Sequence, residues 1–211
     1  MAKRSVIVVG VLLVVVTAWV GAGSLSGRGF GFGERDCTLT SGTAADGVLE
    51  GQARCKWPVA VDRVDAVLAA WGDQSQYFGN VAESHVVGQR GDRTLVRQIY
   101  RARGIEDREV VMECFTEAIP GGRRYHWHKA SDQSGNSGRN IEIAVHEGFW
   151  EVRGDEHSTT VEYHMRYLPG GNVPQFLVSM FLSSGIEAAM TDLRRAAAGS
   201  TRVAAAGSGG A

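Results

Sequence analysis

The sequence has almost no excess of charge of either sign. Its 211 residues include 22 Lys and Arg against 23 Asp and Glu, which gives a formal net charge of -1. A protein that binds nucleic acid through its phosphates needs a basic surface, and this composition supplies no overall basic field. We therefore expect no nucleic-acid partner. With 44% hydrophobic residues and no internal repeat, the chain suits one ordinary globular domain with appendages.

The sequence also lacks the short motifs that are typical of several common enzyme families. It contains no GxSxG, HExxH or Walker motif, and no GxGxxG that opens a helix after a strand. The stretch RGFGFG at 28–33 lies in a segment rich in Gly and Ser, which indicates flexibility and not phosphate binding. The spacing of the three cysteines matches no zinc site. No catalytic residue, metal or cofactor is therefore predicted.

The first 26 residues have the layout of an export signal or a single membrane anchor. Lys3 and Arg4 precede an uncharged run whose most apolar part is Val6 to Val20. This length falls between that of a signal peptide core and the ~20 residues that span a bilayer. We favour an anchor with Lys3 and Arg4 on the cytoplasmic side and the rest of the chain outside. The alternative is cleavage after Ala22 and secretion.

Two further segments are predicted to lie outside the folded domain. Residues 27–48 are rich in Gly and Ser and suit a linker, whereas 199–211 resemble a disordered tail. Cys37 lies in this linker and Cys55 at the start of the domain, so an oxidising compartment would allow a disulfide between them. Cys114 would then remain as a buried thiol. Three unpaired thiols are the alternative, because sequence spacing does not establish disulfide geometry.

The segment from Leu168 to Ala198 predicts a turn followed by one long helix. Pro169-Gly170-Gly171 is typical of a chain reversal, Asn172 suits a helix N-cap, and Pro174 suits the first helical turn. Apolar residues then recur mostly three and four positions apart and form a broad stripe. A helix this apolar needs a large surface to cover.

The preceding residues have the pattern of strands and turns. A first strand at 48–57 is followed by a helix from Asp62 and a short helix at 73–79. Six more strands are expected at 81–89, 94–102, 108–118, 123–131, 140–152 and 158–168. Short connections imply antiparallel neighbours. The predicted fold class is α+β, with a curved antiparallel seven-stranded sheet that grips the long C-terminal helix and two short helices after the first strand.

The last predicted strand alternates most clearly between apolar and polar residues. One face carries Val161, Tyr163, Met165 and Tyr167, and the other carries Thr160, Glu162, His164 and Arg166. We expect the first set to face the helix and the second to face water. A strongly curved sheet wrapped around one helix leaves room for a cavity between them.

Several stretches also carry a family resemblance. They are WPVAVDRVDAVLAAWGDQSQYFGNVAESHVV at 57–87, Ile105 through Val111, Gly148-Phe149-Trp150, and Tyr163 through Val178. In their order and spacing they resemble the START-like, helix-grip superfamily of polyketide cyclases and lipid-transport domains, over residues 49–198. This resemblance implies a pocket for lipids, sterols or other apolar molecules. Members of the superfamily share no fixed catalytic set, so the resemblance implies fold and ligand polarity but no particular substrate.

The expected cavity wall combines residues of the sheet with residues of the long helix. Methionines are adaptable fillers, and small residues at the centre of the helix leave room beside the sheet. The candidate cavity residues are Met112, Trp127, Tyr163, Met165, Leu177, Met180, Phe181 and Ser184. The alternative for these positions is ordinary core packing.

Histidines and arginines offer weaker signals. His126 and His128 share a face of one strand, and neighbouring strands bring His146 and His164, but ordinary, partly exposed histidines are expected instead of a metal site. Four arginines could favour anionic headgroups at a membrane surface, although surface arginines usually signify only solubility. They are Arg97, Arg101, Arg103 and Arg108.

The function that these patterns favour is non-enzymatic binding or transfer of a hydrophobic small molecule, most simply a lipid. The expected partners are that ligand and, through the N-terminal segment, a membrane, and we expect a monomer. One alternative is an aromatase/cyclase-type enzyme acting on a polyketide-like substrate, which an export signal disfavours. The other is an interaction module of the cell envelope without a pocket.

Overall fold

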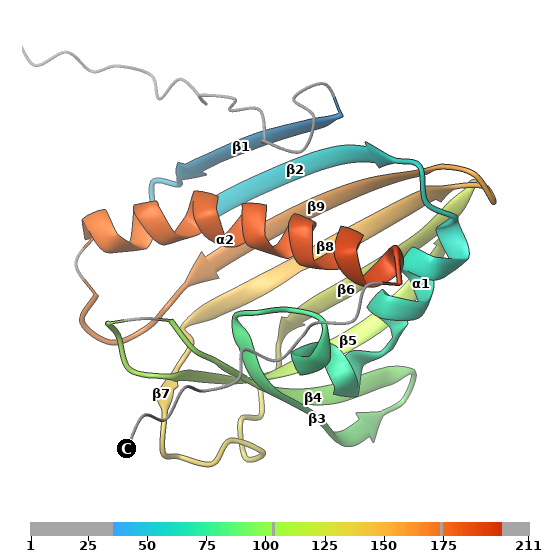
Figure 1. Ribbon diagram of the computed structural model, residues 1–211. Coiled ribbons are helices and arrows are strands. Elements are labelled where there is room, and N and C mark those ends of the chain that lie inside the picture. The colour runs from blue at the N-terminus through green and yellow to red at the C-terminus, as the bar shows by residue number, and fades with distance from the viewer. Residues whose placement is uncertain (1–35, 103, 174, 200–211) are drawn as a thin grey trace, which may run out of the picture.

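The computed structural model describes residues 36–199 apart from 103 and 174, with side chains for all of these except 175–183. In chain order the elements are β1 (Cys37–Thr43), β2 (Leu49–Trp57), α1 (Val61–Ala69), η1 (Trp71–Gln76), β3 (Val81–Arg90), β4 (Arg93–Tyr100), β5 (Arg108–Ile119), β6 (Gly122–Lys129), β7 (Ile141–Glu142), β8 (Val145–Gly154), β9 (Thr159–Leu168) and α2 (Gln175–Ala197). Figure 1 shows α2 lying across one face of a curved sheet, with α1 beside its C-terminal end.

The sheet runs in the order β1-β2-β9-β8-β6-β5-β4-β3, and the neighbours along this path are antiparallel. The short strand β7 instead pairs with β5 in parallel. This arrangement confirms the predicted α+β class and the grip of the sheet on the C-terminal helix. The strand count differs, because the described residues form nine strands where seven were expected. One extra strand is β1, and the other is β7, which Ile143 and Ala144 separate from β8.

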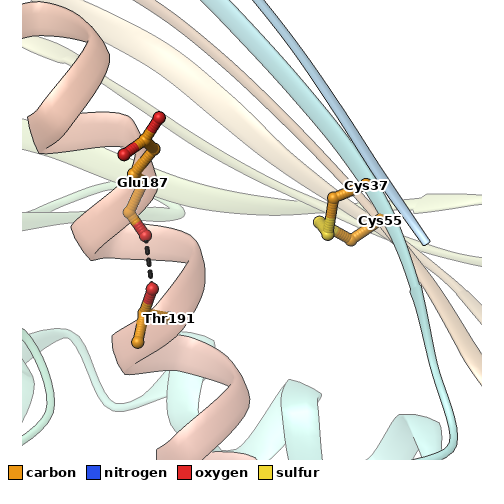
Figure 2. The surroundings of a disulfide bond; sticks show 4 residues. All are labelled: Cys37, Cys55, Glu187 and Thr191. Carbon is orange, nitrogen blue, oxygen red and sulfur yellow. Dashed lines mark hydrogen bonds between the residues drawn. A yellow bond between two sulfur atoms is a disulfide. The ribbon is translucent and has the colours of Figure 1, made fainter. Parts of the chain in front are cut away.

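Strand β1 lies within the segment expected to be a linker. Its sequence, CTLTSGT, is rich in Thr, Ser and Gly, which hides the alternation that buries Cys37 and Leu39. Cys37 stands opposite Cys55 in the register of β1 and β2, and the two form a disulfide. Figure 2 shows this disulfide on the side of the sheet that faces α2. Cys114 is a free, buried cysteine, as expected.

The C-terminal half of α2 anchors the helix to the sheet. Ile186, Met190, Leu193 and Ala197 are all buried, at spacings of three and four residues that place them on one face. Burial of each large apolar side chain contributes about 1.5–3 kcal/mol. Within the same part of the helix the Thr191 hydroxyl donates to the backbone oxygen of Glu187 at 2.6 Å (Figure 2).

Strand β9 follows its predicted alternation. Val161 and Tyr163 are buried in the core, whereas Glu162, His164 and Arg166 are partly exposed on the opposite face. Strand β2, which pairs with β9, alternates in the same way from Leu49 to Trp57. The concave face of the sheet is therefore the apolar one, and α2 covers it.

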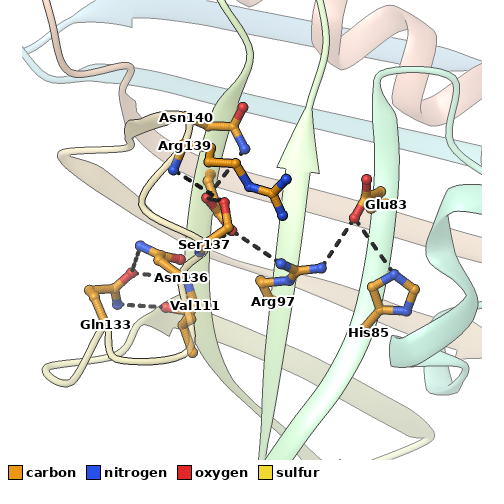
Figure 3. Close-up of polar contacts among 10 residues, drawn as sticks. Glu83, His85, Arg97, Val111, Gln133, Asn136, Ser137, Arg139 and Asn140 are labelled. Atoms are coloured by element: carbon orange, nitrogen blue, oxygen red, sulfur yellow. Dashed lines mark hydrogen bonds and ion pairs between the residues drawn. The ribbon is translucent and has the colours of Figure 1, made fainter.

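The opposite face of β4 and β5 carries a polar network centred on Glu109, which is only 1% exposed (Figure 3). Its carboxylate accepts hydrogen bonds from the Ser137 backbone at 2.8 Å and hydroxyl at 2.7 Å, and from Asn140 at 3.3 Å. Arg97 lies 3.5 Å from Glu109 and 3.1 Å from Glu83. Burial alone would raise the pKa of Glu109, but these hydrogen bonds and the charge of Arg97 bring it below its usual value.

The predicted export segment at 1–26, the first part of the predicted linker and nearly all of the tail at 199–211 fall outside the described residues. Within the described part of the chain, no helix combines the length and the apolarity that a membrane crossing needs.

Candidate ligand cavity

A cavity of about 350 Å³ lies between the concave face of the sheet and α2. Residues of β4, β5, β6, β8 and β9 line it on the sheet side, together with Trp71 and Gln74 of η1. The wall is completed by the middle of α2 and by loop residues after β4 and β9, namely Arg101, Ala102, Ile105, Pro169 and Val173. Its volume lies toward the lower end of the roughly 300–1,000 Å³ that small-molecule sites occupy.

The sheet side of the cavity carries a layer of neighbouring aromatic rings. The ring of Tyr163 lies 4.1 Å from that of Trp150 and 5.7 Å from that of Trp127, measured between centroids. Gly148 makes this layer possible, because a Cβ atom there would lie 2.6 Å from Cζ2 of Trp127. Only a glycine therefore lets the indole lie flat across β8. The Tyr163 hydroxyl donates to the sulfur of Met165 at 3.1 Å. The hydroxyl therefore has a partner within the protein and needs none from an apolar ligand.

The helix side of the cavity is made of small residues. Ser184, Gly185, Ala188 and Ala189 of α2 line the cavity, and a Cβ atom added to Gly185 would meet nothing within 4 Å. Small residues at the centre of α2 therefore leave open space at this part of the helix. A side chain introduced at Gly185 would therefore begin in open space at the cavity wall.

Five of the eight predicted cavity residues line the cavity in the structure. These are Met112, Trp127, Tyr163, Met165 and Ser184. The side chains of the other three, Leu177, Met180 and Phe181, lie outside the described residues.

A chain of buried hydrogen bonds crosses one wall of the cavity. The Ser84 hydroxyl donates to the Trp71 carbonyl oxygen at 2.7 Å and accepts from the Gln98 amide at 3.0 Å. The Gln98 amide nitrogen also donates to the side-chain oxygen of Gln74 at 2.9 Å, and this bond fixes the orientation of the Gln98 amide. The side-chain oxygen of Gln98 therefore points to the Tyr100 hydroxyl and accepts its hydrogen bond. Because Tyr100 has a single proton to donate, its oxygen accepts from the imidazole Nε2 of His146, 2.9 Å away.

His146 is the buried end of this chain. Its pKa is lowered by burial to about 4, so the ring is neutral at neutral pH and carries its proton on Nε2. Its Nδ1 is buried and has no hydrogen-bond partner among the described residues. The expectation of a partly exposed histidine was therefore wrong at this position, because the alternation of β8 turns His146 into the cavity with Trp150.

Arg108 is the one cavity arginine that is both buried and without an ion pair in the described part of the chain. It is 4% exposed and lines the cavity. Its Nη1 donates to the backbone oxygen of Glu106, while its buried Nε has no partner among the described residues. The expectation of a surface arginine was wrong here, whereas Arg101 is exposed and pairs with Asp107 at 2.8 Å.

The four histidines considered as metal ligands do not converge. His126 stacks on Phe115 and lies 2.9 Å from Glu117, and His164 stacks on Phe149. These contacts lie on the face opposite the cavity, away from His146. Among the described residues there is no group of three or more His, Cys, Asp or Glu side chains placed to hold a metal ion.

Sequence reasoning missed the polar part of the cavity wall. Gln98, Tyr100, Arg108 and His146 occur in strands that also carry exposed polar residues, so composition alone places them at the surface. The usable signal was alternation, because Val96, Gln98 and Tyr100 share one face of β4 and Val96 is fully buried.

Comparison with known proteins gives the fold a name. No model of a known protein family and no curated protein sequence matches this chain. Solved structures do: a STAR-related lipid transfer protein fragment from Xanthomonas axonopodis superposes with a TM-score of 0.71, at 18% identity over 82% of this chain and 98% of that one. Human StAR-related lipid transfer protein 5 gives 0.70, at 11% identity over 85% and 89%. The ZhuI aromatase/cyclase from Streptomyces sp. R1128 gives 0.52, at 12% identity over 72% and 92%.

These likenesses show that the protein has the START-like, helix-grip fold that its sequence resembles. A fold shared at such low identity is compatible with more than one activity, as the lipid transfer and cyclase neighbours illustrate. The activity must therefore be argued from the cavity.

Proposed function

We propose that this protein binds a lipid or similar hydrophobic small molecule in the cavity between its sheet and α2, and carries it without chemical change. The observation that carries the proposal is the cavity itself, with its aromatic layer on one side and small residues of α2 on the other. Removal of apolar ligand surface from water is worth about 25 cal/mol per Å². A few buried polar groups at one wall would orient the ligand.

The place of action that we propose is the outer side of the cytoplasmic membrane. It rests on the sequence of residues 1–26, in which a short basic start precedes an apolar run. The disulfide between Cys37 and Cys55 supports the same placement, because disulfides persist mainly in oxidising compartments. The domain would then act as a tethered carrier close to the membrane surface.

Native mass spectrometry of the full chain in a non-ionic detergent, followed by organic extraction, tests the carrier function. We expect a bound mass of lipid size that a Gly185→Trp variant loses, because the indole would occupy space at the cavity wall. Glu187→Trp on the same helix is the matched control, since Glu187 is not part of the cavity wall, and it should keep the bound mass. A bound mass that both variants retain, or none after incubation with a lipid mixture, would contradict the proposal.

A second candidate is a cyclase-type enzyme, and the Tyr100–His146 pair in the cavity is the observation that favours it. General acid–base catalysis works best when the pKa of the catalytic group lies near the working pH. Burial instead raises the pKa of Tyr100 well above its usual value and lowers that of His146 to about 4. The pair is thus poorly tuned to donate or accept protons near neutrality, which favours ligand binding. If the protein turns over a polyketide-like substrate and the Tyr100→Phe variant does not, the enzyme function would be favoured over ligand binding.

A further inference from the structure

The cavity contains a buried positive charge that the described protein does not neutralise. Arg108 opens β5, is 4% exposed and lines the cavity. Among the described residues its side chain makes no ion pair, and the single hydrogen bond of that side chain goes to the neutral backbone oxygen of Glu106. Arginine stays protonated at any physiological pH, so it cannot escape burial by losing its proton. Its charge therefore calls for a counter-charge from elsewhere.

The other polar groups of the cavity do not supply that counter-charge. His146 is neutral near pH 7, because burial lowers its pKa to about 4. Burial raises the pKa of Tyr167 to about 12, although the positive charge of Arg108 acts to lower it. The Tyr167 hydroxyl therefore stays protonated. Tyr100 stays protonated for the same reason. The two acidic residues next to Arg108 along the chain are already paired, Asp107 with Arg101 and Glu109 with Arg97.

We propose that Arg108 is the anchor for an anionic head group, and that the ligand is a single-chain amphiphile carrying a carboxylate or a phosphate. The planar guanidinium suits both groups, because it presents paired N–H donors to two oxygens at once. The apolar chain of the ligand lies along the aromatic layer formed by Trp127, Trp150 and Tyr163. A volume of about 350 Å³ favours one chain over the two chains of a membrane phospholipid. This inference rests on the proposed carrier function and names the class of its ligand.

Photoaffinity labelling of the full chain in non-ionic detergent tests this inference. Three probes share one alkyl chain with a mid-chain diazirine and differ only in the head group, which is a carboxylate, a phosphate monoester or an alcohol. Labelled peptides are mapped by mass spectrometry. In the wild-type chain we expect at least one anionic probe to label cavity residues roughly tenfold more than the alcohol does. Whichever anionic probe labels more identifies the carboxylate or the phosphate as the preferred group.

Three variants separate the charge of Arg108 from the shape of the cavity. Arg108→Met should reduce labelling by the anionic probes to the level of the alcohol, whose own labelling stays unchanged and reports an intact cavity. Arg108→Lys should restore part of the anionic labelling, because it keeps the charge and loses the fork of donors. Arg54→Met is the matched control, since Arg54 is exposed, pairs with Glu162 at 3.3 Å and is not part of the cavity wall. It should behave as wild type.

The outcomes distinguish this inference from the function on which it rests. Equal labelling of wild-type cavity residues by all three probes would overturn the anionic anchor and leave the carrier function standing. Full anionic labelling in Arg108→Met would overturn the anchor as well. If no probe labels cavity residues in any variant, the carrier function itself fails.

Discussion

Arg108 and Glu109 are consecutive residues of β5, and both are almost completely buried, at 4% and 1% exposure. They face opposite sides of the sheet and differ in how their charges are met. Glu109 accepts hydrogen bonds from Ser137 and Asn140 and lies beside Arg97. Arg108 has only the backbone oxygen of Glu106 among the described residues.

The difference separates a structural site from a binding site. On the outer face of β5 the loop that follows β6 supplies the donors Ser137 and Asn140, and β4 supplies Arg97, so the network holds that loop in place (Figure 3). On the inner face the corresponding space is a cavity. Removal of one partner from a paired buried charge is destabilising, and a buried charge without a partner costs stability until a ligand neutralises it.

The largest expected effect is on the outer face. Glu109→Ala should lower the free energy of unfolding by about 3–5 kcal/mol, because it leaves Arg97 and the Ser137 amide without their buried acceptor. Urea denaturation of the full chain measures it. Glu83→Ala, which removes the half-exposed carboxylate on the other side of Arg97, is the control and should cost less than about 1 kcal/mol. Equal losses in the two variants would show that burial of Glu109 does not matter.

Acidification should remove the stability contributions of the two faces at different pH values, that of His146 on the inner face before that of Glu109 on the outer face. The folded pKa of His146, about 4, lies below its unfolded value of about 6.5, so the unfolded chain binds the extra proton first. Stability should therefore fall by up to about 3 kcal/mol as the pH drops from 6.5 to 4. Glu109 has the same sign, because its pKa is also lowered, but its contribution is lost only as the pH falls below its ordinary value of 4.5.

Unfolding of wild type and His146→Gln across this pH range tests that order. The loss of stability between pH 6.5 and 4.5 should be much smaller in the variant, while the loss below pH 4.5 should remain. Identical slopes in wild type and variant would mean that His146 is not held neutral in the folded protein.

The smallest expected effect has the opposite sign. Arg108→Met should raise the free energy of unfolding of the ligand-free chain by about 1–2 kcal/mol, because it replaces an unpaired buried charge with an apolar side chain of similar length. Urea denaturation after removal of bound lipid gives the value. A loss as large as that of Glu109→Ala would mean that Arg108 has a structural partner and would erase the contrast between the faces.

The sequence predicted what depends on periodic patterns. The alternation of β9, the apolar stripe of α2 and the small residues near Gly185 gave the fold class and five of the described cavity residues. Strand β1 was missed because it is held by its pairing with β2 and by the disulfide to Cys55, contacts that its Thr- and Ser-rich sequence does not reveal. Arg108 was taken for a surface residue because composition does not say which face of a strand is covered. Only the three-dimensional structure shows that β5 is buried on both faces at this point.

The most direct test of the account is NMR of the full chain with carbon-13-labelled methionine methyl groups, in deuterated detergent with added palmitate. Met112 and Met165 line the cavity, whereas Met190 is buried in the core away from it. We predict nuclear Overhauser contacts from the palmitate chain to the methyl groups of Met112 and Met165 and none to Met190. Contacts to neither cavity methionine at saturating palmitate, or equal contacts to all three, would contradict binding in the cavity.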